Sequence, residues 1–142
     1  MNYQNVIDYK IQMLIDLMLT DGVSPCELSD NIFEEKYISI SFSKINGYIV
    51  GKLNFYENEN VLQNVQMIYT YSKDKVLMKI EEEVSGKKQL LWDRKSREED
   101  LMEEILYYLK HCYNQKQIDK FIMSLPKNLK DRISEYMSTL SA

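Results

Sequence analysis

The chain has 142 residues with 18 basic and 22 acidic side chains, which gives a formal net charge of -4. A chain of this length forms one domain of ordinary size and can build a hydrophobic core without a metal or a disulfide. The apolar content of 44% excludes an intrinsically disordered chain, and the longest apolar stretches fall far short of the roughly 20 residues that a membrane-spanning helix needs.

Residues 1–35 are predicted to form two helices. In the first of them, apolar residues recur at spacings of three and four, namely at Tyr3, Ile7, Ile11, Leu14 and Met18. Gly22 ends this helix, because glycine is the usual residue just past a helix C-terminus. Ser24 and Glu27 have the spacing of a capping box, which indicates that a short second helix begins there and extends to Glu35.

A β-hairpin is expected next, with its turn at Asn46-Gly47, the strongest short hairpin signal in the chain. A two-residue loop pairs Ile38 with Phe55, Ile40 with Leu53 and Phe42 with Gly51. The large apolar residues then share one face of the sheet, so the register is well specified. The opposite face carries the pairs Tyr37 with Tyr56, Ser39 with Asn54 and Ser41 with Lys52.

Two further hairpins complete the predicted sheet. A turn at Lys73-Asp74 pairs Tyr71 with Val76, Tyr69 with Met78 and Met67 with Ile80. A turn at Ser85-Gly86 sets Glu83 opposite Lys88, which is a favourable cross-strand charge pair. Five consecutive strands joined by short turns predict an antiparallel meander over residues 36–93.

The remaining residues, 95–141, are predicted to form three helices. Ser96 has the spacing of a capping box with Glu99, and the inward stripe of the first helix is Leu101, Ile105, Tyr108 and Cys112. Asn114 caps the second helix, and Pro126 separates it from the third. The sequence therefore predicts a single α+β domain over residues 1–142, with two N-terminal helices, a five-stranded antiparallel meander sheet and three C-terminal helices packed on the sheet.

No catalytic, cofactor or metal site is predicted. The only histidine, His111, is followed by Cys112, and neighbours on a helix lie about 100° apart and cannot easily converge on one ion. We interpret His111 as a solvated residue and Cys112 as a core residue. The four glycines are scattered and form no phosphate-binding loop: Gly22, Gly47, Gly51 and Gly86. An enzyme that uses carboxylates and tyrosines without a recognised motif stays open as an alternative.

The composition also bears on location and origin. Two cysteines, Cys26 and Cys112, cannot make a disulfide framework, and the N-terminus has no basic residues before its apolar run. We therefore expect an intracellular, cytoplasmic protein with reduced thiols. The chain has a single alanine and many residues with AT-rich codons, which indicates a low-GC bacterium or a phage or plasmid in one.

Acidic side chains are dense after the sheet, at Glu98, Glu99, Asp100, Glu103 and Glu104. One interpretation is a solvated helix face matched to the helix dipole. The other is a docking surface for a basic or nucleic-acid-binding partner protein, because a field of one sign raises association rates.

The eleven tyrosines are the most suggestive feature of the sequence. Tyr37, Tyr48 and Tyr56 are expected on the polar face of the first hairpin, beside Lys52. Three interpretations stay open for this face: a core under the protein's own helices, a partner interface, or a platform that stacks bases. The candidate partner-binding residues are Tyr37, Tyr48, Tyr56, Lys52, Glu99 and Glu103.

These observations favour a non-enzymatic interaction protein that binds and blocks another macromolecule, such as an inhibitor, immunity or anti-defence protein of a phage or mobile element. The alternative is a transcriptional regulator or other nucleic-acid-binding protein. Residues 110–142 hold six basic and three acidic side chains, but the acids interrupt the lysines, so no tight duplex DNA binding is expected. No membrane partner is expected, and a homodimer is left open.

Overall fold

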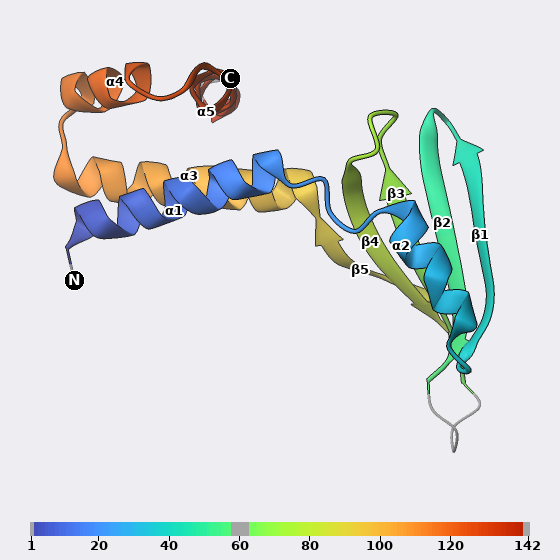
Figure 1. Ribbon diagram of the computed structural model, residues 1–142. Coiled ribbons are helices and arrows are strands. Elements are labelled where there is room, and N and C mark those ends of the chain that lie inside the picture. The colour runs from blue at the N-terminus through green and yellow to red at the C-terminus, as the bar shows by residue number, and fades with distance from the viewer. Residues whose placement is uncertain (1, 58–62, 141–142) are drawn as a thin grey trace. The chain divides into compact units, whose positions relative to one another are not determined.

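The computed structural model describes residues 2–57 and 63–140 and has an α+β fold (Figure 1). Its elements are α1 (Tyr3–Leu19), α2 (Pro25–Ser29), the 3-10 helix η1 (Asp30–Phe33), β1 (Tyr37–Ile45), β2 (Tyr48–Tyr56), β3 (Asn64–Tyr71), β4 (Leu77–Val84), β5 (Lys87–Asp93), α3 (Arg94–Cys112), α4 (Gln115–Met123) and α5 (Lys127–Leu140). This order confirms the predicted fold class. No helix in the described ranges is long and apolar enough to cross a membrane.

The chain divides into two compact units. The helical unit consists of Met1–Leu19 and Ser96–Ala142, and the sheet unit of Thr20–Lys95. The sequence carries no proline-rich or glycine-rich linker between them, which is why it suggested one domain.

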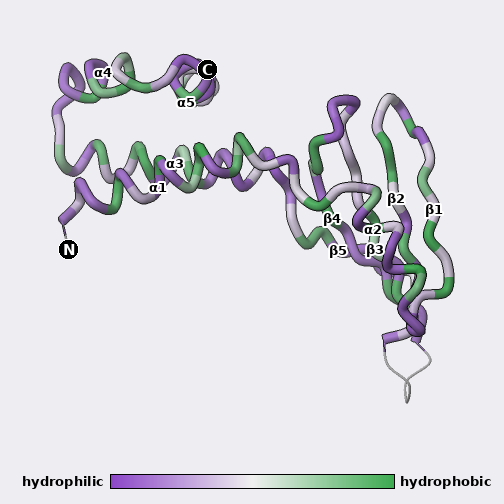
Figure 2. The backbone as a smooth tube through the Cα atoms, in the orientation of Figure 1, coloured by the Kyte–Doolittle hydropathy of each residue, from purple (hydrophilic) through white to green (hydrophobic). Residues whose placement is uncertain are grey.

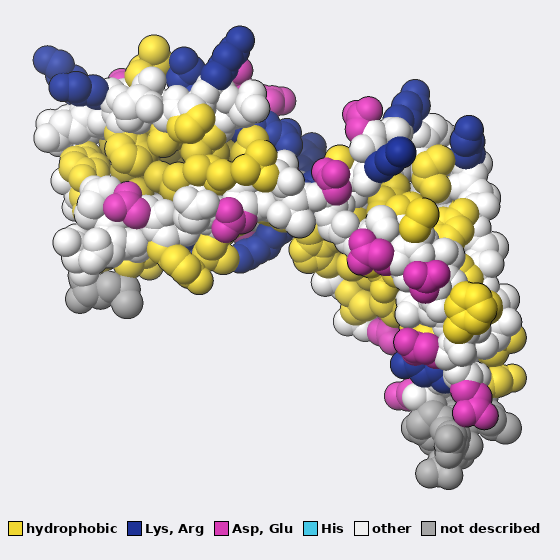
Figure 3. All heavy atoms as spheres, in the orientation of Figure 1, with side chains coloured by type: hydrophobic (Ala, Val, Ile, Leu, Met, Phe, Trp, Pro, Cys, Tyr) yellow, Lys and Arg dark blue, Asp and Glu magenta, His cyan; other side chains and the backbone are white. Residues whose placement is uncertain are grey.

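The four long helices of the helical unit share one core. Their apolar stripes bury Ile7, Leu14, Leu101, Ile105, Leu109, Ile118, Ile122, Leu129 and Ile133. The buried side chains of the three C-terminal helices therefore form their core with α1. In Figure 3, apolar side chains gather between α1 and the α4–α5 pair. The predicted cap of α4 is confirmed, because Asn114 and Gln117 form a capping box.

The five strands of the sheet unit follow the order β1-β2-β3-β4-β5, as predicted. Figure 2 shows apolar and polar residues alternating along β1 and β2. One face, which we call the core face, buries Leu53, Tyr71 and Leu77 against Leu28 of α2. The helix α2, which begins at the predicted Ser24 capping box, thus contributes the cover of this face (Figure 1). Sequence periodicity indicated that the face is apolar but did not identify its cover.

The first hairpin turns at Asn46-Gly47, as predicted, with φ angles of 51° and 86°. The predicted pairs Ile40–Leu53 and Phe42–Gly51 are both present. A methyl group on Gly51 would lie 2.5 Å from the Phe42 ring, so only glycine accommodates this aromatic side chain across the strand.

The start of this hairpin differs from the prediction. A β-bulge lies between Tyr37 and Ser39, so Tyr37 pairs with Phe55, and the predicted pairs Ile38–Phe55 and Tyr37–Tyr56 are wrong. A bulge adds one residue to one strand and so changes which face the residues before it occupy. Tyr37 consequently joins the core face.

The second hairpin is shifted by two residues from its predicted register. Tyr69 pairs with Ile80 instead of Met78, because the turn is longer than two residues. The Ser72 N–H donates to the Val76 carbonyl at 2.9 Å, and Lys75 has a φ of 69°. A shift of two keeps the residues from Lys79 to Val84 on their predicted faces. A β-bulge between Thr70 and Tyr71 then pairs Tyr71 with Leu77 instead of Val76, so Leu77 joins the core face, opposite to the prediction. The third turn, at Ser85-Gly86, and the pair of Glu83 with Lys88 are confirmed.

Hydrogen bonds fasten the segment before α2 to the end of the sheet. The Leu77 N–H donates to the Asp21 carbonyl at 2.8 Å. The buried Arg94 donates from Nε to the Leu77 carbonyl at 2.7 Å and from Nη2 to the Thr20 carbonyl at 2.8 Å. Because α3 begins at Arg94, directly after β5, the predicted capping box at Ser96 is wrong.

Candidate functional site

Tyr37 does not lie on the polar face of the sheet. Its ring centroid is 5.3 Å from that of Phe55, and it packs against the core of the sheet unit. The Lys36 ammonium lies 5.5 Å from the centre of the Tyr37 ring. Burial raises the pKa of Tyr69, and the neighbouring Tyr37 raises it further, which agrees with both rings sharing the core face. Tyr37 therefore contributes to the core of the sheet unit.

Tyr48, Lys52 and Tyr56 do share the opposite face, along β2. Tyr48 and Tyr56 are both exposed but stand at the two ends of the strand. Eight residues separate them, which is about 26 Å at 3.3 Å per residue. Two rings so far apart do not form one aromatic patch, and the structure therefore does not bring the three predicted tyrosines together.

Amide side chains occupy the middle of this face. The Asn54 side chain donates to the Ser39 hydroxyl at 3.0 Å, and the Gln66 side chain donates to the Asn54 carbonyl oxygen at 3.1 Å. The three side chains form a hydrogen-bonded row across β1, β2 and β3. Polar side chains of three neighbouring strands are thus hydrogen-bonded to one another on this face.

Two acidic residues of α3 form ion pairs, and two others are exposed to solvent. Glu98 is buried and accepts a 2.8 Å hydrogen bond from Arg132 of α5, so the expectation that it belongs to a solvated patch is wrong. Glu104 is 2.6 Å from the Lys10 ammonium of α1. In the described part of the helical unit, Asp100 and Glu103 are exposed and have no ion-pair partner.

These two free carboxylates line a shallow hollow on the helical unit. The hollow has a volume of about 450 Å³ and is formed by α1 and α3, with Lys10, Asp100, Glu103, Glu104, Tyr107 and Tyr108 at its surface. We call it the acidic hollow. Among the candidate partner-binding residues of the sequence, only Glu103 lines it.

Two tyrosines of α3 line the acidic hollow and pack against further aromatic rings. Tyr107 and Tyr108 are perpendicular to each other, with centroids 5.3 Å apart, and Tyr107 lies 4.3 Å from the ring of His111. Tyr3 of α1 packs 5.7 Å from Tyr108. Tyr107 is 57% exposed, so much of its surface is available to a ligand in the hollow.

Glu99 lies outside the lining of the hollow, and its carboxylate acts with those of Asp100 and Glu103 on Tyr136. Burial raises the pKa of Tyr136 of α5, and the carboxylates of Glu103, Glu99 and Asp100 raise it further in that order. The three carboxylates are therefore close enough to one phenol to favour its neutral form. The three carboxylates therefore cluster on the part of α3 near Tyr136.

The cysteines and the histidine are dispersed. Cys26 and Cys112 are both exposed, so the expectation of a core role for Cys112 is wrong: it is the last residue of α3. The exposed His111 hydrogen-bonds the Tyr107 carbonyl through Nδ1 at 2.9 Å. Within the described residues, no group of three or more His, Cys, Asp or Glu side chains is arranged to hold a metal ion.

Comparisons of the chain with protein-family models, with curated proteins and with solved structures found no match. The interpretation of the acidic hollow therefore rests on its own residues. Sequence reasoning identified Glu103 but missed Tyr107, which lies four residues further along α3, one turn away on the same side. That spacing was available in the sequence, whereas the contribution of Lys10 depends on how α1 packs against α3.

Proposed function

We propose that the protein binds a basic segment of another protein in the acidic hollow and so blocks the surface to which that segment belongs. The observation that carries this proposal is the combination of free carboxylates and an exposed aromatic ring, Asp100, Glu103 and Tyr107, around one concavity. Lysine and arginine side chains bind carboxylates through charge-assisted hydrogen bonds and aromatic faces through cation–π contacts. The hollow offers both.

The charge arrangement favours a cationic ligand over an anionic one. Lys10 already pairs with Glu104 at 2.6 Å, so its ammonium is engaged, whereas Asp100 and Glu103 have no basic partner among the described residues. A lysine or arginine of a partner protein would provide these carboxylates with a counterion. An anionic nucleic acid would meet uncompensated like charge at this surface.

An inhibitor, immunity or anti-defence role follows from the chemistry of such a partner. Basic surfaces of proteins commonly bind nucleic acids or other polyanions. A protein that covers such a surface competes with the polyanion, and it does so without catalysis. We place this activity in the cytoplasm of a low-GC bacterium or of a phage or mobile element host, in keeping with the composition and the two free cysteines.

Affinity capture from the source cell tests the proposal with matched variants. Glu103→Lys reverses a charge in the hollow, and Tyr107→Ala removes its exposed ring. Asp74→Lys makes the same kind of charge change in an exposed turn of the sheet unit, and Tyr9→Ala removes another exposed tyrosine of the helical unit. We expect the wild type and both controls to retain one basic protein and the two hollow variants to lose it.

Calorimetry with the captured protein then measures its affinity for each variant. The purified partner is titrated against each variant by calorimetry, at low and at moderate salt. Binding that is equal in wild type and Glu103→Lys, or a captured partner whose contact region is acidic, contradicts the proposal. Loss of binding in Asp74→Lys instead would move the contact to the sheet unit.

A further inference from the structure

The strand β1 is an open edge of the sheet. The order of the strands makes β1 and β5 the two edges, and in the described ranges no strand pairs with the outer side of β1 (Figure 1). β1 has nine residues, contains no proline and has Lys44 as its single charged side chain. All residues from Ser41 to Ile45 are exposed. A long edge of this kind is a ready template for pairing with another strand.

The hairpin turn fixes which backbone groups of β1 are free. Ile45 and Tyr48 flank the type I′ turn, and in such a turn these two residues are hydrogen-bonded to each other. Hydrogen bonding to β2 then alternates along the strand, at residues 45, 43 and 41. The N–H and C=O groups of Ile40, Phe42 and Lys44 therefore point outward. None of the three takes part in the described backbone hydrogen bonds outside the regular elements.

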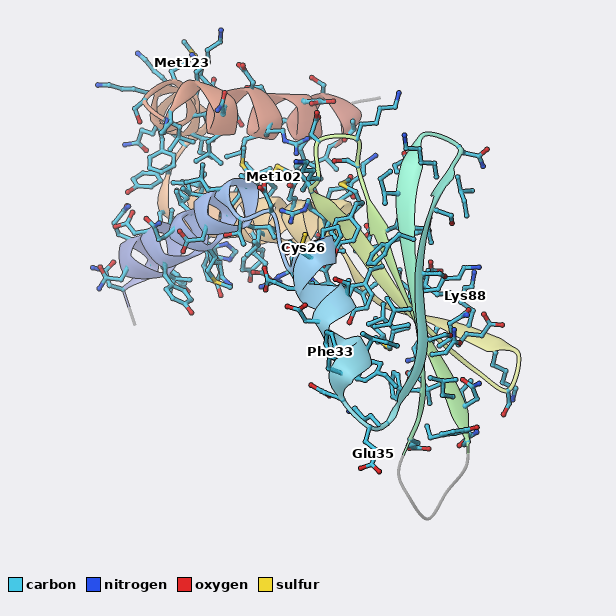
Figure 4. The ribbon with its side chains drawn as sticks, turned by 45° about the vertical axis from the view of Figure 1, so that its right-hand side comes forward. Cys26, Phe33, Glu35, Lys88, Met102 and Met123 are labelled. Atoms are coloured by element: carbon cyan, nitrogen blue, oxygen red, sulfur yellow. The ribbon has the colours of Figure 1, made fainter. Side chains whose placement is uncertain are left out.

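The other edge of the sheet is protected in a way that β1 is not. β5 begins with two lysines, Lys87 and Lys88, the second of which is labelled in Figure 4. A β-bulge where Leu91 is the extra residue interrupts its pairing with β4. Charged side chains and bulges are the usual means by which proteins prevent edge pairing. In β1 the bulge lies at Tyr37–Ser39, which leaves Ile40–Ile45 as a regular pairing segment.

We propose that β1 pairs antiparallel with β1 of a second copy of the chain, about a two-fold axis at Phe42. In this register Phe42 faces Phe42 of the second copy, Ile40 faces its Lys44, and Ser41 faces its Ser43. The outward backbone groups of residues 40, 42 and 44 then face each other, as a hydrogen-bonded antiparallel ladder requires. A two-fold contact needs a self-complementary surface, and this segment is one.

Apolar contacts favour a second copy as the occupant, and charge does not oppose it. Lys44 is the only charged residue of β1, and in this register the two Lys44 side chains lie opposite isoleucine instead of opposite each other. Each Phe42 ring is 38% exposed and packs over Gly51 of β2. In the dimer the two Phe42 rings form a cross-strand aromatic pair.

Paired charge substitutions test both the dimer and its register. Ser41 and Ser43 are exposed and lie on the face opposite the core. Ser41→Lys with Ser43→Lys places like charges opposite each other twice in the dimer. Ser41→Lys with Ser43→Glu places opposite charges there instead. Analytical ultracentrifugation of the purified chain over a concentration series, with circular dichroism to verify folding, measures the dimerisation constant.

We expect a concentration-dependent dimer for the wild type, a dimerisation constant weakened about ten-fold or more in the lysine–lysine variant, and a value near the wild type in the lysine–glutamate variant. Gln89→Lys, which adds a lysine to β5, serves as the matched control and should leave the dimer unchanged. A monomeric wild type at every concentration overturns the proposal. So does equal weakening in both paired variants, or a dimer that only Gln89→Lys disrupts. Because no other protein is present, these outcomes do not depend on the acidic hollow.

Discussion

The hydroxyl of Tyr71 is predicted to make the sheet unit sensitive to alkaline pH. Its side chain is 1% exposed, and it donates a 2.6 Å hydrogen bond to the Val23 carbonyl. Burial, together with the nearby Tyr69 and Glu27, raises the pKa of Tyr71 from 10.0 to about 12. The folded state therefore holds the phenolic proton more tightly than the unfolded state does. This stabilisation is present below pH 10 and is lost as the pH rises towards 12.

The size of the effect follows from the shift in pKa. A difference of about two pKa units corresponds to about 2.7 kcal/mol at 1.36 kcal/mol per unit. Tyr71→Phe should lose about 1 kcal/mol at pH 7, because it removes the hydrogen bond to Val23. Above pH 10, however, the variant should lose less stability than the wild type, because it has no phenol to ionise at this site.

Urea unfolding followed by circular dichroism at pH 8, 10, 11 and 12 measures this difference. The remaining tyrosines ionise in both proteins, so the comparison isolates position 71. Tyr9→Phe, at an exposed position, is the control and should follow the wild type. If wild type and Tyr71→Phe lose the same free energy between pH 10 and pH 12, burial does not hold the Tyr71 proton and the reasoning is refuted.

Three further predictions concern the turn, the buried ion pair and nucleic acids. Gly47→Val should lower the unfolding free energy by about 1–3 kcal/mol, because Gly47 has a φ of 86°, and wild-type stability in a urea titration would contradict this. Arg132→Ala should cost about 1–3 kcal/mol because it leaves the buried Glu98 carboxylate unpaired, whereas adding Glu98→Gln should recover part of that loss in a double-mutant cycle. With a net charge of -4, the chain should not bind duplex DNA tightly at moderate salt. A gel shift with submicromolar affinity that depends on Lys116, Lys120 and Lys127 would favour a nucleic-acid-binding function instead.

The sequence predicted a turn correctly only where the turn residues favour the positive φ angles that the turn needs. Asn46-Gly47 and Ser85-Gly86 both have positive φ angles, and both predicted turns are correct. The turn between β3 and β4 places its positive φ at Lys75, a residue that gives no signal for that conformation. A shift of two residues keeps Ile80 on the predicted apolar face, so hydrophobic alternation could not expose that error. Nor could it expose the bulge that brings Leu77 to the core face, because Val76, Leu77 and Met78 are all apolar. The bulge after Tyr37 was equally hidden, because both Tyr37 and Ile38 suit an apolar face.

Helical periodicity indicated which side of each helix is buried but not what covers it. The predicted stripe of α3 is correct at Leu101 and Ile105 but wrong at the exposed Cys112, and the common core of α3 with α1 required the three-dimensional structure. Glu98 is instructive, because it lies three residues before Leu101 and seven before Ile105, on the stripe predicted to be buried. Its acidic neighbours suggested solvent exposure, whereas its position in the stripe indicated burial. The ion pair with Arg132 reconciles the charge with that position.

Different interactions would stabilise the two proposed contacts, so the salt dependence of binding distinguishes them. A cationic ligand in the acidic hollow is held largely by Asp100 and Glu103, whose exposed charges are screened as salt rises. Pairing at β1 relies on backbone hydrogen bonds and on contacts of Phe42, with Lys44 opposite an apolar residue, and none of these needs a long-range field. The dimerisation constant of the chain should therefore change little with salt, whereas capture of a basic partner should weaken strongly. A dimer that dissociates with added salt as readily as the partner complex would mean that charge, not strand pairing, holds the two copies together.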